Sequence, residues 1–410
     1  MIDRPTDECD AMSSAPSARI VWLIAIGISL GPAVSNGIAR FAYGLILPAM
    51  RDELGWTYAQ AGWLNTANAI GYLVGALISL AFISSLGARR LFNYGMAVTA
   101  LSLILCGVIK DFWGLSALRL IAGIAGAPVF IAGGTLAATL FKEDNTRNSM
   151  AIAVYFGGGG LGQLASGAVV PLILDHYGNA VWPQIWLLLG TVSAIALVPA
   201  WMAVRSVREA GAGPSLSRPA SLPYARMIPA LSGYFLFGLG YLIYMTFLVA
   251  WMRDEGASQF LVAAVWSLMG IGTILSPFVW RGVLSRARGG GAMAAANLAT
   301  GAGVFCALVF PAPAGVLVSA ALVGLSFYIV PTSATTFGRK NLDQPQWGRS
   351  FAAFTIVFSI GQMIGPVAAG AVADATRSIA LGLAGAGAIL ILGAAVAAVQ
   401  KAIRPISHRV

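Results

Sequence analysis

The tetrapeptide Met50-Arg51-Asp52-Glu53 returns later in the chain as Met252-Arg253-Asp254-Glu255, and each copy directly follows a long apolar stretch. Several matches at one offset indicate an internal repeat, and the chain is therefore expected to consist of two related halves. Further pairs at nearly the same offset are Gly37 with Gly238, Tyr43 with Tyr244, Arg40 with Tyr241, and Gly162-Gln163 before Asp175 with Gly361-Gln362 before Asp374.

The composition shows that these halves are built for a lipid environment. Hydrophobic residues make up 58% of the 410 residues and charged residues only 10%, and the mean hydropathy is +0.81. Soluble domains average about a quarter charged residues. The 49 glycines and 19 prolines are scattered through apolar runs, as they are in membrane helices. A soluble globular protein is excluded.

Twelve segments are apolar over the roughly 20 residues that a helix needs to cross a bilayer. They are 20–50, 56–84, 91–109, 112–141, 149–174 and 182–204, and then 227–252, 259–280, 292–310, 315–337, 350–373 and 379–399. The polar stretch 205–226 is rich in Gly, Ser and Pro and predicts a flexible linker. The expected domains are a tail 1–19, a bundle 20–204, the linker 205–226, a bundle 227–399 and a tail 400–410.

The basic residues predict how these helices are oriented. Of the 25 Lys and Arg residues, four lie on one side of the twelve-helix arrangement and two lie within helices, which leaves nineteen on the other side. The positive-inside rule assigns that side to the cytoplasm. The sequence thus predicts a multi-pass protein of the cell inner membrane with both termini cytoplasmic. The four are Arg51, Lys110, Arg253 and Arg377, and the two are Arg40 and Arg119.

Six helices in each half return the chain to the side on which the half began, so both halves have the same orientation. The expected fold class is an all-α membrane protein with twelve transmembrane helices as two six-helix bundles related by a pseudo-two-fold axis. Such repeats form transporters whose halves rock around a solute site near the midplane. A non-transporting membrane sensor is the alternative, but such proteins usually carry a soluble output domain, and the longest loop, 205–226, is too short for one.

Several short motifs resemble those of the major facilitator superfamily. Leu118-Arg119-Leu120-Ile121-Ala122-Gly123 is similar to its helix-4 arginine motif, and Gly361-Gln362-Met363-Ile364-Gly365-Pro366 is similar to the glycine-proline motif of its antiporters. Ser84-Ser85-Leu86-Gly87-Ala88-Arg89-Arg90 keeps the glycine and arginines of its loop motif, with serine in place of the gating aspartate. Gly37-Ile38-Ala39-Arg40-Phe41-Ala42-Tyr43 resembles the YbfB/YjiJ-type group. The resemblance implies the twelve-helix carrier fold and gating roles for Gly87, Arg89, Arg90, Gly361, Gly365 and Pro366.

Two arginines fall inside apolar helices, and they carry the functional hypothesis. An arginine at the bilayer centre costs about 2.5–3.5 kcal/mol on insertion scales, so it should face a cavity or a partner. Arg40 shares a helix face with Asn36 and Tyr43. Its alternative role is a bond to helix carbonyls at a kink near Pro48. The resemblance implies that Arg119 could equally organise the bundle and any proton coupling.

Polar residues on other helices should face the same pathway, although each alone could simply form an interhelical hydrogen bond. Asn65, Asn68 and Tyr72 share one helix face; Tyr234, Tyr241 and Tyr244 share another, as do Tyr328, Thr332 and Thr335, and Thr355 accompanies Gln362. The candidate substrate-binding residues are Asn36, Arg40, Tyr43, Asn65, Asn68, Arg119, Gln163, Tyr241, Tyr244, Tyr328 and Gln362.

All 15 acidic residues lie in tails, loops or helix ends. Two buried arginines without a buried acid favour an anion, because a guanidinium binds a carboxylate through two hydrogen bonds. The sequence therefore predicts a secondary transporter of small or aromatic organic acids, with a multidrug or amphiphile exporter of the same fold as the alternative. Protons are a possible coupling ion, carried by the substrate's own carboxylate or by Asp175 with His176.

Other features argue against further chemistry. The glycine run Gly157–Gly160 lies inside an apolar helix and lacks the Gly-Lys-Ser/Thr of a phosphate loop, so it predicts close helix packing. Cys9, Cys106 and Cys306 match no metal or disulfide spacing. No nucleophile and base are paired, and the basic residues form no soluble face for nucleic acid. We expect no cofactor, no metal, no enzymatic activity and a monomer whose partners are the small-molecule substrate and the lipid bilayer.

Overall fold

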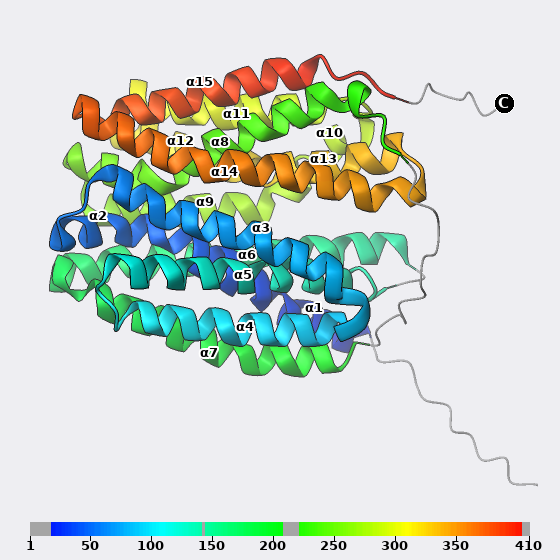
Figure 1. Cartoon of the computed structure of the whole chain (residues 1–410), viewed down its shortest axis with the longest axis horizontal. Helices are drawn as coiled ribbons and strands as arrows, with labels where there is room; N and C mark the ends of the chain where they lie inside the picture. The colour runs from blue at the N-terminus through cyan, green and yellow to red at the C-terminus, as the bar shows by residue number, and fades with distance from the viewer. Residues whose placement is uncertain (1–17, 142–143, 208–220, 404–410) are drawn as a thin grey trace, which may run out of the picture.

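The computed structural model describes residues 18–141, 144–207 and 221–403, and all regular structure in these ranges is helical (Figure 1). The N-terminal half comprises one long rod, made of α1 (Ala18–Pro32), the π-helix η1 (Ala33–Phe41) and α2 (Ala42–Leu54), followed by α3 (Tyr58–Leu86), α4 (Ala88–Cys106), α5 (Phe112–Ala137), α6 (Asn145–Tyr177), the short η2 (Asn179–Val181) and α7 (Trp182–Arg205). The C-terminal half comprises α8 (Tyr224–Asp254), α9 (Gln259–Val279), α10 (Arg281–Arg286), α11 (Gly291–Val309), α12 (Pro313–Ser326), α13 (Ile329–Asn341), η3 (Gln344–Gln346), α14 (Trp347–Thr376) and α15 (Ile379–Ala398).

Within the described ranges, eleven helical rods are long and apolar enough to cross a membrane. A twelfth rod, α4, has 19 residues and packs against α5 and α7. It is less apolar than the others because Arg89 and Arg90 occupy its first turn. The predicted all-helical membrane fold is confirmed, while the full count of twelve spans depends on α4.

Local capping explains where the helices begin and end. The segment predicted to begin at residue 56 begins at Tyr58, because the Thr57 hydroxyl accepts a hydrogen bond from the Gln60 amide and the Gln60 side chain accepts one from the Thr57 amide. This helix ends before Gly87, whose φ of 82° is readily adopted only by glycine. The caps therefore place the ends of a helix a few residues away from the bounds that hydropathy alone predicts.

Two predicted helices are not continuous α-helices. The segment predicted as 315–337 is divided into α12 and α13, with Phe327 and Tyr328 between them. Pro331 lies in the first turn of α13 and has no amide hydrogen to donate to the Phe327 carbonyl, which coincides with the break. Pro48 and Pro366, by contrast, lie within unbroken helices. The first segment, expected as one helix kinked near Pro48, instead contains nine residues of π-helix directly after Pro32.

The two halves lie side by side, with α1 to α7 in one layer and α8 to α15 in the other (Figure 1). Across the interface α3 packs against α14, α6 against α9, and α2 against α8. Glycines bring these helices into backbone contact. A Cβ at Gly62 would clash with the Pro366 carbonyl, and one at Gly370 with the Tyr58 carbonyl. On the other flank, Gly160 and Gly270 meet in the same way.

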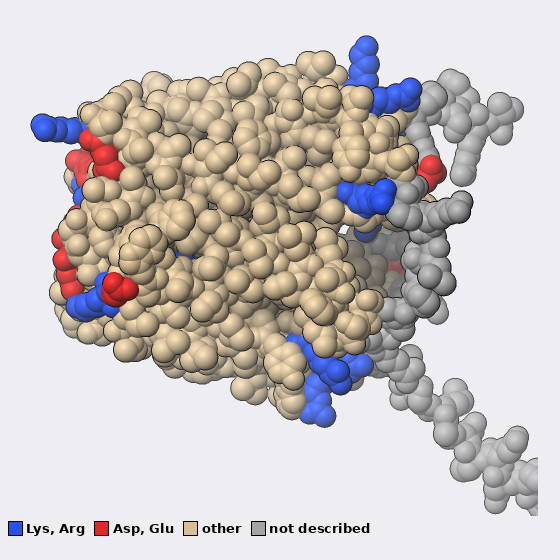
Figure 2. Space-filling model, viewed as in Figure 1, with Lys and Arg blue, Asp and Glu red and all other residues tan. Residues whose placement is uncertain are grey.

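Charged residues gather at the two ends of the molecule and leave a broad uncharged band between them (Figure 2). We call the end where α1 begins and α15 finishes the basic end, and the other the acidic end. Figure 2 also shows a hollow between the two halves at the basic end. The acidic residues described at the acidic end are Asp52, Glu53, Asp111, Asp175, Asp254, Glu255 and Asp374, and those at the basic end are Asp144 and Asp343.

Candidate functional site

The π-helix η1 places the candidate site in the middle of the long first rod. All nine of its residues are buried. Its backbone lies directly against α6, since a Cβ at Gly37 would lie 2.6 Å from the Gly159 carbonyl oxygen and 2.7 Å from the Gln163 amide nitrogen. Segments of π-helix are rare and occur frequently at functional sites. Here the wider helical turn carries both Asn36 and Arg40.

Arg40 is buried and has unused hydrogen-bonding capacity. Its residue is only 5% exposed, yet Nε and one terminal nitrogen, Nη2, have no hydrogen-bond partner. The guanidinium lies over the ring of Tyr72, with 5.0 Å from Cζ to the ring centroid. The side-chain oxygens of Ser35 and Asn36 are likewise buried without a partner. Because buried polar atoms are nearly always paired, these unpaired atoms are candidates for hydrogen bonds to a polar ligand.

Further polar side chains come from α6, α8, α14 and the α12–α13 junction. Asn36 Nδ2 donates to the Tyr328 hydroxyl at 3.2 Å, a hydrogen bond that joins the two halves. Gln362 Nε2 donates to the Tyr241 hydroxyl, which leaves Gln362 Oε1 without a partner. Both side-chain amide atoms of Gln163 are buried and unpaired. The hydroxyls of Tyr72, Tyr234, Tyr241 and Tyr328 lie within the electrostatic reach of the Arg40 charge. We define the central site as Asn36, Arg40, Tyr72, Gln163, Tyr241, Tyr328 and Gln362.

On the side of the site that the C-terminal half contributes, aromatic rings are stacked almost parallel to one another. Tyr241 stacks on Phe237 at 4.7 Å and 11°, on Phe358 at 5.7 Å and 7°, and on Phe327 at 6.1 Å and 18°. Tyr234 extends the stack, lying 4.8 Å from Phe358 at 13°. Such faces attract other flat rings in offset-stacked arrangements. The central site thus combines a cationic, amide-rich N-terminal side with an aromatic C-terminal side.

Arg119, the second buried arginine, is occupied by protein atoms. It donates to the Ala39 carbonyl and, at 3.2 Å, to Asn65 Oδ1. Its Cζ lies 4.8 Å from the centroid of the Tyr43 ring. Asn68 donates to the Arg119 carbonyl at 3.1 Å, and Tyr43 to the Ala61 carbonyl at 2.7 Å. The structure therefore groups Tyr43, Asn65, Asn68 and Arg119 as a hydrogen-bonded network within the N-terminal half, next to the central site but distinct from it.

Three other candidates lie elsewhere. The Tyr244 hydroxyl is 2.7 Å from the Ser319 hydroxyl, so it joins α8 to α12 inside the C-terminal half. Asp175 and His176 are exposed in the last turn of α6 at the acidic end. Twelve residues of helix separate Asp175 from Gln163, which is about 18 Å along the axis.

The candidate gating residues occupy two different kinds of position. Gly361 and Gly365 allow α14 to lie against α8, because a Cβ at either would clash with the carbonyl of Phe235 or Leu239. Pro366 contributes the carbonyl that touches Gly62 across the interface. At the basic end, Gly87 ends α3, and Arg89 Nη1 donates to the Arg205 carbonyl at 3.4 Å, while Arg90 is exposed.

A set of hydrogen bonds between the halves at the acidic end escaped the sequence reasoning. The Asp374 carboxylate accepts the backbone amides of Tyr58 and Ala59, at 2.8 and 2.9 Å, and so caps the start of α3 from the other half. The Tyr58 hydroxyl donates to Asp254 at 2.7 Å, and Arg51 lies over the Tyr58 ring. We call this group the acidic-end latch. Two features of the sequence point to this group: the capping-box residues Thr57 and Gln60, which mark the start of a helix, and Asp374, which is one of the residues matched in the internal repeat.

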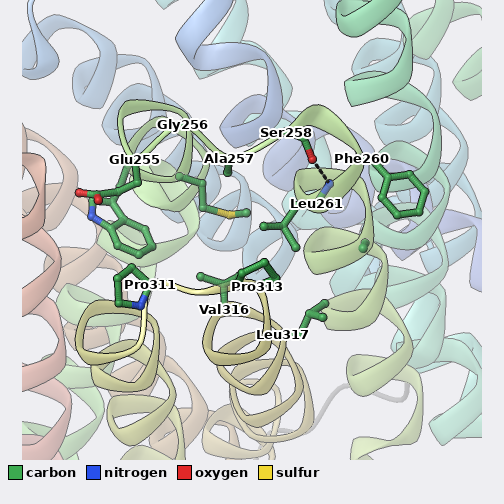
Figure 3. Close-up of a pocket in the computed structure, with 13 residues that line it drawn as sticks. Glu255, Gly256, Ala257, Ser258, Phe260, Leu261, Pro311, Pro313, Val316 and Leu317 are labelled. Atoms are coloured by element: carbon green, nitrogen blue, oxygen red, sulfur yellow. Dashed lines mark hydrogen bonds between the residues drawn. The ribbon is translucent and has the colours of Figure 1, made fainter.

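Tyr72 is expected to face the pathway but is not among the candidate substrate-binding residues, and the stacked phenylalanines are not predicted at all. Tyr72 had been placed on one helix face with Asn65 and Asn68, but only its position over Arg40 shows its role. A separate pocket of about 520 Å³ lies at the acidic end between the end of α8, the start of α9 and the start of α12 (Figure 3). It is mostly apolar, with Glu255 and Ser258 at its edge, and contains none of the predicted site residues. No group of metal-binding side chains occurs among the described residues.

Comparison with known proteins identifies the family of the chain. Residues 32–398 match the family described as "Uncharacterised MFS-type transporter YbfB". The gallate transporter of Pseudomonas putida is 26% identical over 209 residues, covering 50% of this chain and 45% of that protein. The 4-hydroxybenzoate transporter PcaK of Acinetobacter baylyi is 28% identical over 190 residues, covering 46% and 40%. The matched region is therefore less than half the length of either relative.

Solved structures show the same fold at low identity. A bacterial homologue of the human lysosomal transporter Spinster, in an inward-facing and occupied conformation, superposes with a TM-score of 0.69 at 12% identity, covering 94% of this chain and 97% of that one. The nucleoside transporter NupG gives 0.68 at 14% identity, covering 92% and 98%. With a family match over most of its length, the chain belongs to the YbfB-type family of major facilitator superfamily transporters and is a multi-pass membrane transporter, not an enzyme.

Proposed function

We propose that the chain is a secondary carrier of small organic anions, and that its preferred substrates are aromatic carboxylates. The observation that carries this proposal is Arg40, whose Nε and Nη2 are buried without partners. Asn36 Oδ1 and both side-chain amide atoms of Gln163 are also buried without partners. A carboxylate fits a guanidinium edge with two parallel hydrogen bonds. An aromatic ring attached to that carboxylate would extend over the stack formed by Tyr241, Phe358 and Phe237.

The charge pattern supports the choice of an anion over a cation. Every acidic residue described lies at the acidic or the basic end, so the interior between the two ends contains Arg40 and Arg119 but no carboxylate of the described residues. A buried cationic substrate would need such a carboxylate for balance. Two relatives are named as transporters of gallate and of 4-hydroxybenzoate, and both compounds are aromatic carboxylates. These names are consistent with the proposed substrate class.

The proposed mechanism is alternating access between the bundles 20–204 and 227–399. The acidic-end latch and the Asn65 hydrogen bond to Thr246, 2.7 Å long, hold the halves together from the acidic end to the middle. The hollow between the halves opens at the opposite end (Figure 2). We assign the basic end to the cytoplasm, because Arg and Lys are enriched there, and the protein to the cell inner membrane as a monomer. Much of the proposed linker 205–226 and of both tails lies outside the described residues.

The gating proposal follows from the same contacts. Closure of the acidic end needs the close approach of α3 and α14 at Gly62 and Pro366. Gly361 and Gly365 let α14 move as one body with α8. Gly87, Arg89 and Arg90 are proposed to act at the basic end. Coupling through Asp175 and His176 stays a prediction.

Proteoliposomes test this function directly. In vesicles preloaded with unlabelled 4-hydroxybenzoate, the reconstituted protein should take up radiolabelled 4-hydroxybenzoate from the exterior. External unlabelled benzoate should compete, whereas the cation ethidium should not be transported. Arg40→Gln should abolish uptake, and the matched control Arg286→Gln, which removes an exposed arginine, should not. Ethidium transport without any carboxylate flux would refute the proposal in favour of an amphiphile exporter.

A further inference from the structure

The central site holds positive charge that no protein carboxylate balances, and this has a consequence for the mode of transport. The inference rests on the proposed function, because it assumes that the anion is the substrate. Arg40 and Arg119 interact electrostatically with each other. The two terminal nitrogens of Arg119 donate to neutral partners, the Ala39 carbonyl and the Asn65 amide oxygen, and its Nε has no partner, so its charge is not cancelled either. Arg40 has the Tyr72 ring and two unpaired nitrogens.

The acidic residues are too far along the helices to cancel this charge. Those of the acidic end cap helices or pair locally: Asp374 with the α3 amides, Asp254 with Tyr58, and Glu53 with Lys110 at 2.7 Å. Asp111 accepts from the Gly114 amide at the start of α5. Within the described ranges the spans thus offer no carboxyl group that could neutralise the arginines, and none that could bind and release a proton beside Arg40.

Alternating access requires a state in which both ends are shut around the central site. In that state the guanidinium of Arg40 cannot be reached by water, and an unpaired buried charge is strongly unfavourable. A bound carboxylate supplies the missing charge through two hydrogen bonds, so the loaded carrier passes through the shut state more easily than the unloaded one. A hundredfold difference in the two rates corresponds to about 2.7 kcal/mol of extra barrier.

We propose that the protein is an obligatory anion exchanger, in which one carboxylate leaves for each carboxylate that enters. The unloaded carrier returns too slowly to sustain net uptake, since no side chain can replace the charge of the substrate. Exchange of equal charges moves no net charge across the membrane and needs no proton. Its partner anions are therefore organic carboxylates on both sides, and their concentration ratio sets the direction of transport.

The test compares two sets of proteoliposomes with the wild-type protein. One set contains unlabelled 4-hydroxybenzoate, the other only Hepes and potassium sulfate, and uptake of labelled 4-hydroxybenzoate is measured with valinomycin and potassium clamping the membrane potential. Uptake into loaded vesicles should be faster by about 100-fold, the ratio that corresponds to the barrier above. Equal rates in both sets, or rapid uptake into unloaded vesicles driven by an inside-alkaline pH gradient, would overturn exchange while leaving the anion function intact.

A second variant tests the physical reason itself. Asn36 lies four residues before Arg40 in the same π-helix, so Asn36→Asp places a carboxylate beside the guanidinium. The unloaded carrier should then return freely, and the ratio of loaded to unloaded uptake should fall toward one even though substrate affinity is weaker. A transporting Asn36→Asp protein with the wild-type ratio would refute the charge argument. Absence of carboxylate flux in every wild-type vesicle would refute the proposed function and the exchange proposal together.

Discussion

Replacing Arg40 by glutamine should remove substrate binding without harming the fold. The two unpaired nitrogens, Nε and Nη2, are available for two charge-assisted hydrogen bonds, and each such bond contributes about 1.5–3 kcal/mol. The glutamine amide can restore one neutral bond of about 1 kcal/mol. The net loss is at least about 2 kcal/mol, and with the lost Coulomb attraction we expect a Kd increase of about 100-fold, since about 1.4 kcal/mol corresponds to a factor of ten.

Titration calorimetry of purified protein with 4-hydroxybenzoate measures this change. Arg40→Lys keeps the charge but loses the fork of two parallel donors, so its Kd should rise by about tenfold, which separates geometry from charge. The melting temperature of Arg40→Gln should equal or exceed that of the wild type, because removing an unpaired buried charge relieves a desolvation penalty. A Kd within about threefold of the wild-type value for Arg40→Gln would refute the assignment of Arg40 as the carboxylate ligand.

Further predictions concern the network, the latch and the interface. Arg119→Gln should destabilise the protein by about 3 kcal/mol, because it leaves buried acceptors unpaired; a thermal melt unchanged from wild type would contradict this structural role. Asp374→Asn should weaken closure of the acidic end, since an amide accepts with one oxygen only, and maleimide labelling of Ala250→Cys in an otherwise cysteine-free chain should become faster. Gly62→Val should block closure by clashing with a carbonyl of α14 and so stop transport, whereas Gly385→Val, whose Cβ meets nothing within 4 Å, should transport normally.

The sequence predicted the fold well because membrane helices are specified by simple rules. Long apolar runs, the charged residues between them and the internal repeat can all be recognised in the sequence without knowledge of tertiary contacts. The segments that failed were those where a single residue breaks the regular pattern. Pro331 interrupts the predicted tenth helix, and Pro32 precedes the π-helix, and hydropathy does not register either effect.

The candidate site was predicted in part. Arg40, Asn36, Tyr241, Tyr328 and Gln362 were found because polar residues inside apolar helices are unusual, and the structure brings them together. Spacing could not distinguish the roles of the two arginines. Arg119 is bound by a carbonyl of another helix, a contact that depends on the register of the π-helix and has no signature in the side-chain pattern.

The glycine contacts between the halves favour tilting of one bundle relative to the other. At Gly62, Gly370, Gly160 and Gly270 one main chain lies directly against another. At such points the helices can tilt against each other with few changes of side-chain rotamer. Side chains that mesh across a boundary would instead have to disengage at each cycle. The helix pairs α3–α14 and α6–α9 can thus serve as pivots, about which the bundles tilt while the packing inside each bundle stays the same.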